Sequence, residues 1–296
     1  MKGKNGFRGL TLIVMAATFA IGCNDDHFST VVYTQSPAGN TWGDLYLMNY
    51  SGGDRSRVTD SGADAYPRWS PDKEKIAFNR RIGGPAGHWD IYLINPDGTG
   101  EVELVGGDAD DVNPAWSPDG SKLAYQSNRS GTNEIWIMNV ETGLEWVLPI
   151  AGDVFPTHPT WSPAGDKIAF RGVGGPGIGG LTGIWVVNYP AGDGLTLLAE
   201  DGNEPDWSHA SRRGEDKIVY RLAGDIKVMN GDGTDQRIVT QGEFPTWSVK
   251  FDEIVFQRYR SSATEHDFDV YRVQADGTLL FQMTDDADVD QRYPHW

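Results

Sequence analysis

The sequence has a single cysteine, Cys23, so no disulfide can form within the chain and no second thiol is present to act as a nucleophile. Basic residues are few: 25 Lys and Arg stand against 42 Asp and Glu, which gives a formal net charge of −17. This balance excludes nucleic acid as a partner, because a surface that binds nucleic acid needs excess positive charge. Long segments with the apolar period of a helix are missing, whereas 37 Gly and 11 Trp are present. These features predict an all-β chain with many turns.

The first 22 residues have the pattern of a secretory signal peptide. Three basic residues precede an apolar run over 10–21, which is too short to span a bilayer comfortably. The letters AIGC (20–23) resemble the lipobox of bacterial lipoproteins, whose cysteine is lipidated and becomes the new N-terminus. The resemblance implies a signal peptide over 1–22, a short tether over 23–29 and a lipid anchor at Cys23 in the bacterial cell envelope, periplasmic or surface-exposed. The alternative is a signal peptide cleaved nearby, with no role for the cysteine.

One tripeptide, Pro-x-Trp, recurs six times, at steps of 47, 45, 46, 40 and 49 residues. A period in this range, with about four strands per unit, is typical of a β-propeller. In "NPAWSPDGSKLAYQSN" (113–128) the tripeptide opens a hairpin, with a short apolar strand, a Ser-Pro-Asp-Gly turn and a second strand. The copies lie at Pro67-Arg68-Trp69, Pro114-Ala115-Trp116, Pro159-Thr160-Trp161, Pro205-Asp206-Trp207, Pro245-Thr246-Trp247 and Pro294-His295-Trp296.

The two ends of the repeat array complement each other. The array begins with the second strand of a unit (31–33) and finishes on Trp296, in the first strand of a unit. The third strands, such as 90–95, are apolar at most consecutive positions, so both of their faces must be covered by neighbouring blades. We therefore expect one domain over 30–296, an all-β six-bladed propeller of four-stranded blades whose C-terminal strand joins the N-terminal blade and closes the ring.

The repeat Trp-Ser-Pro-Asp-Gly-x-x-Leu/Ile-Ala-Tyr/Phe, followed by Asp/Glu-Ile-Tyr/Trp-x-Met/Ile-Asn, resembles that of TolB-type propellers over essentially all of 30–296. The match is strongest up to about residue 170, and the repeats at 207–210 and 247–250 lack the Pro-Asp-Gly turn. The resemblance implies the fold. It also implies a docking role, because related propellers serve as docking platforms in the bacterial envelope, although some are parts of enzymes.

Strand alternation places the loops that enter the first strands and those that join second to third strands at the same end of the propeller. We call this end the mouth. Its loops are rich in carboxylates and arginines, as expected for a binding surface carried on a rigid scaffold. The candidate binding residues are Asp64, Asp108, Asp110, Asp111, His158, Glu204, Asp206, Glu243, Asp286, Asp288 and Asp290, together with Arg80, Arg129 and Arg258.

Three interpretations of these residues stay open. They can form a solvated ring of ion pairs, each of little energetic value. They can form an acidic mouth that receives a cationic segment of another envelope protein, which suits the excess of acidic residues. In the third interpretation Asp108, Asp110 and Asp111 supply oxygen ligands to a calcium ion; no other cofactor is expected.

An enzyme is the competing class of function. The chain has neither a Gly-x-Ser-x-Gly elbow nor a His-Glu-x-x-His motif, and no catalytic residue is assigned. His88, His158, His266 and His295 could converge near the mouth, which would suit a lyase or hydrolase acting on a saccharide or peptide. Because these histidines are scattered over different repeats, the sequence favours a binding platform.

Overall fold

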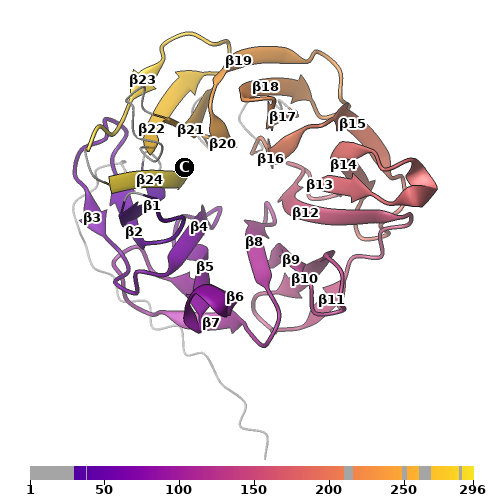
Figure 1. Ribbon diagram of the computed structural model, residues 1–296, viewed down its shortest axis with the longest axis horizontal. Helices are drawn as coiled ribbons and strands as arrows, with labels where there is room; N and C mark the ends of the chain where they lie inside the picture. The colour runs from indigo at the N-terminus through magenta and orange to yellow at the C-terminus, as the bar shows by residue number, and fades with distance from the viewer. Residues whose placement is uncertain (1–29, 38, 210–215, 249–251, 260–267, 287–288) are drawn as a thin grey trace, which may run out of the picture.

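The computed structural model describes residues 30–37, 39–209, 216–248, 252–259, 268–286 and 289–296. Within them the chain forms six four-stranded antiparallel sheets, the blades, which stand around a central axis (Figure 1). This confirms the predicted all-β six-bladed propeller. None of the helices in these segments has the length and apolar character needed to cross a membrane.

Each blade runs from an inner strand at the axis to an outer edge strand. Blade 1 contains β24 (Val289–His295), β1 (Val31–Pro37), β2 (Asp44–Met48) and β3 (Ser56–Arg57). Blade 2 contains β4 (Asp64–Trp69), β5 (Ile76–Ile82), β6 (His88–Ile94) and β7 (Val102–Val105). Blade 3 contains β8 (Asp111–Trp116), β9 (Lys122–Ser127), β10 (Glu134–Asn139) and β11 (Glu145–Val147).

The second half of the ring repeats this order. Blade 4 contains β12 (Val154–Trp161), β13 (Lys167–Gly174), β14 (Thr182–Asn188) and β15 (Thr196–Glu200). Blade 5 contains β16 (Asn203–Trp207), β17 (Lys217–Leu222), β18 (Asp225–Asn230) and β19 (Arg237–Gln241). Blade 6 contains β20 (Glu243–Trp247), β21 (Glu253–Tyr259), β22 (Phe268–Gln274) and β23 (Phe281–Gln282). Two short 3-10 helices, η2 (Gly84–Ala86) and η3 (Pro176–Ile178), follow β5 and β13 at the mouth.

The ring closes as the sequence predicts. β24 pairs antiparallel with β1, from Val32 opposite His295 to Pro37 opposite Val289, so the last strand of the chain is the inner strand of blade 1. Trp296 is fully buried against Val31, Tyr33 and residues of blade 6. Closure covers the edge of β1 with β24, so this edge is not left free to pair with another chain.

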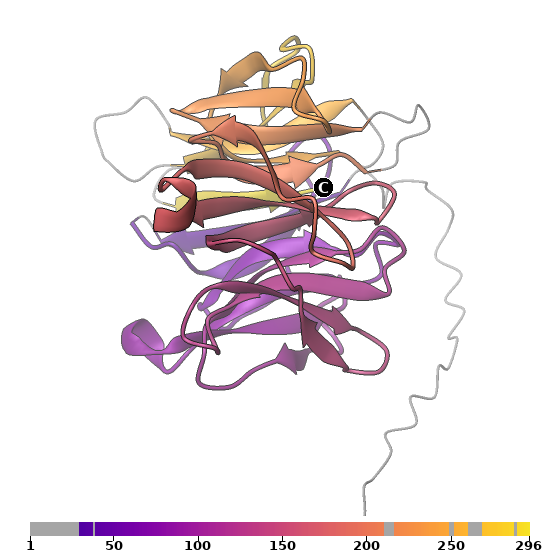
Figure 2. The same ribbon diagram turned by 90° about the vertical axis from the view of Figure 1, so that its right-hand side faces the viewer.

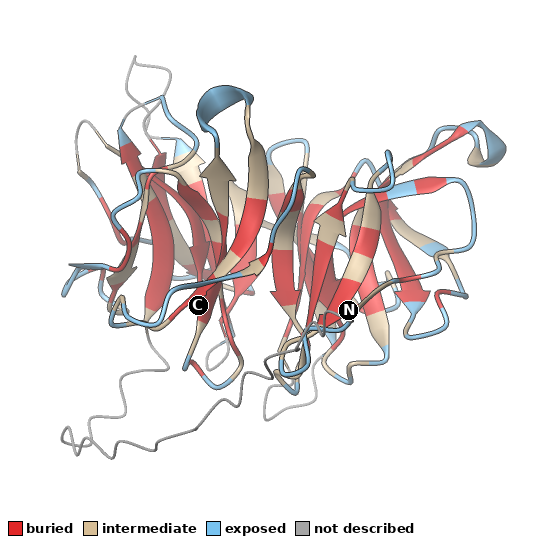
Figure 3. Cartoon of the chain, turned by 90° about the horizontal axis from the view of Figure 1, so that it is seen from below, coloured by how far each residue is buried: buried red, intermediate tan, exposed pale blue. Residues whose placement is uncertain are grey.

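The hydrophobic core lies between neighbouring blades, where β-branched and aromatic side chains of one sheet pack on the next. Second strands are its centre: Ile76, Ala77 and Phe78 of β5 are fully buried. Figure 3 shows buried positions along the strands and exposed ones in the turns at both faces. Seen from the side in Figure 2, the strands of the blades run between the two faces of the ring, so the loops at each face are held on a rigid frame.

Candidate functional site in the central channel

Several predicted mouth carboxylates are buried ion-pair partners. Asp64 and Asp111 are the first residues of the inner strands β4 and β8 and are 0% and 1% exposed. Asp64 Oδ1 lies 2.7 Å from Arg80 Nε, and Asp111 Oδ1 lies 2.9 Å from Arg129 Nη2. We expected these side chains on exposed loops; they stand at strand ends instead, where an arginine of the neighbouring strand or loop compensates the burial of charge.

Blade 5 repeats the arrangement with Glu204, whose Oε1 lies 3.0 Å from Arg221 Nη1. Burial raises the pKa of Glu204, while a hydrogen bond from the backbone N–H of Phe244 and the charge of Arg221 oppose the rise. The predicted Glu243 is the second carboxylate on this guanidinium, at 3.4 Å.

A second carboxylate also contacts each of the other two arginines. Glu101 lies 2.5 Å from Arg80, and Glu145 lies 2.9 Å from Arg129. With both carboxylates ionised, two negative charges surround one positive charge, so each carboxylate–arginine–carboxylate unit keeps a formal charge of −1. The ion-pair ring therefore leaves the mouth acidic.

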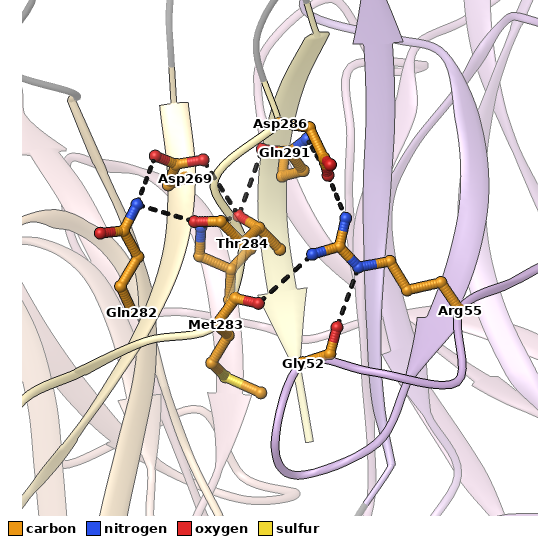
Figure 4. Close-up of polar contacts among 9 residues, drawn as sticks. Gly52, Arg55, Asp269, Gln282, Met283, Thr284, Asp286 and Gln291 are labelled. Atoms are coloured by element: carbon orange, nitrogen blue, oxygen red, sulfur yellow. Dashed lines mark hydrogen bonds and ion pairs between the residues drawn. The ribbon is translucent and has the colours of Figure 1, made fainter.

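The remaining candidates have separate environments. Asp290 is buried and pairs with Arg292 at 2.8 Å. Asp286 contacts Arg55, whose guanidinium also donates to Met283 and Gly52 carbonyls, so this carboxylate joins blade 6 to blade 1 (Figure 4). Arg258 is half-buried at the end of β21. Cys23, His266 and Asp288 lie outside the described residues.

The three calcium candidates point to different partners. Asp110 accepts hydrogen bonds from the Trp89 backbone N–H at 3.1 Å and from Asn128 Nδ2 at 3.3 Å, whereas Asp111 is engaged by Arg129. Asp108 is exposed. Over the described parts of the chain, no three His, Cys, Asp or Glu side chains come together in a group that could hold a metal ion.

A ring of six side chains around the axis was mostly missed by the sequence analysis. In every blade the residue before the proline of Pro-x-Trp has a left-handed backbone, with φ between +48° and +57°, and the inner strand shifts register there. A bulge of this kind re-aims a side chain, and it costs energy for residues other than glycine. The members of this bulge ring are Tyr66, Asn113, His158, Glu204, Phe244 and Tyr293.

Aromatic members fill one side of the bulge ring. The rings of Tyr66 and Tyr293 stack with centroids 3.9 Å apart, and Phe244 meets Tyr293 edge-on at 4.7 Å. Burial raises the pKa values of both tyrosines, so the phenols stay neutral. Asn113, His158 and Glu204 form the other side, where the channel stays polar. Of these three residues, His158 and Glu204 were predicted from the sequence and Asn113 was not.

A cavity of about 470 Å³ opens at the mouth above the polar side of the ring. We call it the mouth cavity. Trp89 and Tyr66 contribute aromatic surface, Asp110 and Arg171 contribute charge, and the rest of the wall is rich in side-chain amides: Asn79, Asn113, Gln126, Asn128 and Asn133. A wall of this composition suits a ligand that offers both hydrogen-bond donors and acceptors.

Two groups on this wall lack hydrogen-bond partners. Asn79 is 0% exposed, and neither its side-chain oxygen nor its nitrogen is hydrogen-bonded. The Nδ1 atom of His158 is also buried without a partner, and burial lowers the pKa of this histidine to about 4, so the ring is neutral at physiological pH. A buried polar group without a hydrogen-bond partner is energetically costly. Such groups therefore mark a place where a ligand can supply the missing partner.

Of the predicted histidines, His158 and His295 both line a second, smaller cavity deeper in the channel, whereas His88 stands apart from them. His88, at the start of β6, lies 3.5 Å from Asp90. His158 belongs to the bulge ring, and His295 lies one step further along the channel, where its Nδ1 accepts a hydrogen bond from the Trp69 backbone N–H. Asp206 holds the same position in blade 5 and accepts a hydrogen bond from the Trp247 backbone N–H at 2.8 Å.

Comparison with known proteins places this geometry in a family context. Residues 40–179 match the family model described as the TolB beta propeller domain. TolB from Acinetobacter baumannii aligns with a TM-score of 0.76 and 18% identity, over 92% of this chain and 67% of that one. No curated protein sequence matches.

Two further solved structures share the fold. A chain of the nidogen/laminin complex aligns with a TM-score of 0.64 and 8% identity, over 90% of this chain and 97% of that one. Oligogalacturonate lyase in complex with manganese aligns with a TM-score of 0.52 and 12% identity, over 86% of this chain and 78% of that one. At these identities the likeness is one of fold, and function has to be argued from the site.

Proposed function

Because this chain is a six-bladed propeller of the TolB type, we propose that it is a binding platform of the bacterial cell envelope, anchored through a lipid on Cys23. Its mouth receives an extended, basic segment of another envelope protein. The observation that carries this proposal is the amide-lined mouth cavity with the unpartnered Asn79 on its wall.

An extended polypeptide fits the chemistry of this wall. Each residue of such a segment offers one N–H donor and one C=O acceptor, and side-chain amides can pair with both. Trp89 and Tyr66 offer apolar surface for the side chains in between. Since Asn79 is already buried in the free protein, binding would give it partners without a further cost of burial.

Charge favours a basic segment. The three carboxylate–arginine–carboxylate units each keep one negative charge, and the whole chain carries −17. A field of this sign raises the rate of encounter with cations more than it raises affinity. The rate of association should therefore fall as salt is added.

The test compares capture of proteins from envelope extract by the wild type and by two mouth variants. Asn79→Leu removes the unpartnered amide, and the double change Asp108→Asn with Asp110→Asn removes two charges at the mouth. The matched control is Asp97→Asn with Asp232→Asn, which removes two charges from exposed turns at the opposite face. We expect both mouth variants to lose most of the captured protein and the control to retain it.

The protein should melt at the same temperature or higher in Asn79→Leu, because a buried amide without partners is replaced by an apolar group of similar size. Loss of capture would then report binding and not unfolding. Equal capture by the wild type, the mouth variants and the control would show the proposal to be wrong. A chelator added to the same assay separates peptide binding from a calcium-dependent contact.

A further inference from the structure

Three consecutive apolar side chains are exposed at the outer rim of blade 6. Leu279, Leu280 and Phe281 have exposed fractions of 72%, 48% and 40%, and they lead into the edge strand β23. Among the described residues, no two other exposed large apolar side chains are adjacent in sequence. Single exposed residues of this kind are ordinary, whereas contiguous apolar surface marks contact with a protein or a membrane. We call these three residues the rim patch.

The backbone of Leu279 has the left-handed conformation, with φ of +54°. Leu279 follows the Asp-Gly-Thr turn at 276–278, and the same turn in blades 2 and 5 is followed by Gly100 and Asp235, with φ of +67° and +55°. Glycine adopts this conformation freely and aspartate tolerates it, whereas the Cβ atom of a leucine makes it strained. Leu279 therefore costs stability through its backbone and also exposes an apolar side chain. The fold gives no reason for leucine at this position.

Neighbours in blades 6 and 1 hold the rim patch in place. Phe281 pairs with Arg272 of β22, whose Cζ atom lies 4.6 Å from the centre of the Phe281 ring and 3.7 Å from that of Tyr50. The Tyr50 and Trp296 rings are 5.7 Å apart, and Trp296 packs against Val31. A continuous series of contacts thus leads from the rim patch to the first strand of the described chain.

The rim patch and the start of β1 lie at the same face of the ring. β1 is the second strand of its blade, so it begins at the face that carries the Ser-Pro-Asp-Gly turns. Leu279 belongs to the connection between a third and a fourth strand, which lies at that face too. Figure 1 shows β23 at the outer edge of blade 6, beside blade 1. We call this face, which is opposite the mouth, the base.

The proposed lipid anchor would bring the base close to a membrane. The tether over 23–29 has seven residues and joins the lipid-carrying Cys23 to Thr30, directly before β1. Seven residues span at most about 25 Å when fully extended, so Thr30 stays within that distance of the bilayer. The apolar body within reach of the rim patch is therefore the bilayer itself.

Charge favours an apolar contact over an electrostatic one. The chain carries −17, and exposed turns of the base contribute carboxylates beside the patch, among them Asp235 and Asp276. An anionic lipid surface repels such a protein. Leucine and phenylalanine side chains instead enter the boundary between headgroups and acyl chains, where the burial of apolar surface stabilises the contact.

We propose that the rim patch is a membrane-contact site, whose Leu279, Leu280 and Phe281 insert into the leaflet that holds the lipid anchor. The contact limits the tilt of the propeller and turns the mouth away from the membrane, toward its partner. This inference goes beyond the proposed function. It rests on the lipid anchor of that function and needs none of the mouth residues.

The experiment measures contact with lipid in the lipidated full chain, reconstituted into vesicles of phosphatidylcholine and phosphatidylethanolamine. Lipidation blocks the sulfur of Cys23, so one added cysteine is the free thiol that takes an environment-sensitive fluorophore. Leu280→Cys places the label in the rim patch. The controls are Leu144→Cys, exposed at the base in blade 3 across the ring, and Leu181→Cys, exposed at the mouth. We expect a quencher on the lipid acyl chains to reduce the fluorescence of the patch label at least about twofold and to leave both controls unchanged.

A further variant tests the neighbouring leucine. Leu279→Gly, made together with Leu280→Cys, removes one apolar side chain and installs a residue that the turn favours, so it should fold at least as well. We expect it to lose about half of the quenching or more. Added salt should leave the quenching unchanged, because the contact is apolar.

The outcomes separate the contact from the anchor. If the wild type is not recovered with membranes, the anchor is absent and the membrane contact falls with it, whereas capture at the mouth is unaffected. If the anchored chain shows no quenching at the patch label, equal quenching at all three labels, or no change on Leu279→Gly, the contact alone is overturned. Quenching that disappears in salt would also overturn it, because the contact would then be electrostatic.

Discussion

The Nδ1 atom of His295 accepts a hydrogen bond from the backbone N–H of Trp69 across 3.3 Å, although the two residues are 226 positions apart. This contact joins the strand that closes blade 1 to the inner strand of blade 2. The same device recurs around the channel: Thr160 Oγ1 accepts from the Trp207 N–H, and Asp206 accepts from the Trp247 N–H. In these three blades the variable residue of Pro-x-Trp thus links one blade to the next.

Replacement of His295 should weaken ring closure. His295→Ala leaves the buried Trp69 N–H without an acceptor, which should lower the free energy of unfolding by about 1–3 kcal/mol in urea denaturation. His88→Ala is the matched control, because that histidine is partly exposed and should change stability by less than about 0.5 kcal/mol. Equal effects of the two changes would mean that the contact across the closure contributes nothing.

The arginines of the mouth should prove structural. Arg129→Met leaves Asp111 buried beside Glu145 without a cation, and we expect a loss of about 2–3 kcal/mol in the free energy of unfolding. Arg57→Met is the control, because its side chain is 51% exposed and its pairs are long, at 3.7 and 3.9 Å. That change should cost less than about 0.5 kcal/mol. Similar costs would indicate that water screens the Arg129 pairs as well.

The fold was predictable because the same pattern of strands and turns recurs along the sequence. Six copies of Pro-x-Trp set the number of blades, and the incomplete units at the two ends indicated which strands meet. The bulge ring was missed for a local reason: a residue before proline prefers an extended backbone, so nothing in Tyr66 or Phe244 suggests a left-handed conformation imposed by the ring. Alignment of the six repeats could have located the bulge ring, since each of its six members directly precedes the proline of a Pro-x-Trp copy.

The mouth was predictable in position but only partly in chemistry. Strand alternation correctly placed Asp64 and Arg80 at the same end, yet burial depends on packing between blades, which no single repeat encodes. Asn79 was missed because it directly follows the apolar residues 76–78, where a polar residue ordinarily marks the exposed end of a strand. Lys73 was missed because a lysine in a turn is ordinarily exposed; only its neighbours show that it is buried.

The lipid anchor is tested by Cys23→Ser. We expect this change to move the protein from the membrane fraction to the soluble fraction of cells, because the sulfur of Cys23 is the atom that would carry the lipid. Fractionation followed by immunoblotting, with a salt wash to remove electrostatically bound protein, measures the outcome. Membrane association that survives both the substitution and the wash would contradict the lipobox interpretation.

The pH dependence of the free energy of unfolding should report the lowered pKa of Lys73. The pKa of this lysine is about 7 in the folded protein and near its ordinary value of 10.5 in the unfolded chain, so between these values the unfolded state binds more protons. The free energy of unfolding should therefore rise as the pH increases from 7 toward 10. Other groups titrate in this range, so the quantity to measure is the difference between the wild type and Lys73→Gly.

At pH 7 we expect Lys73→Gly to be more stable by several kcal/mol, because glycine adopts the left-handed backbone without strain and no ammonium is buried. The advantage should shrink as the pH approaches 10, where the wild-type lysine is neutral when folded. Urea denaturation at four pH values from 7 to 10 gives both curves, and Lys75→Met should show no such convergence. Parallel curves for the wild type and Lys73→Gly would mean that Lys73 titrates normally and is not a buried cation without a hydrogen-bond partner.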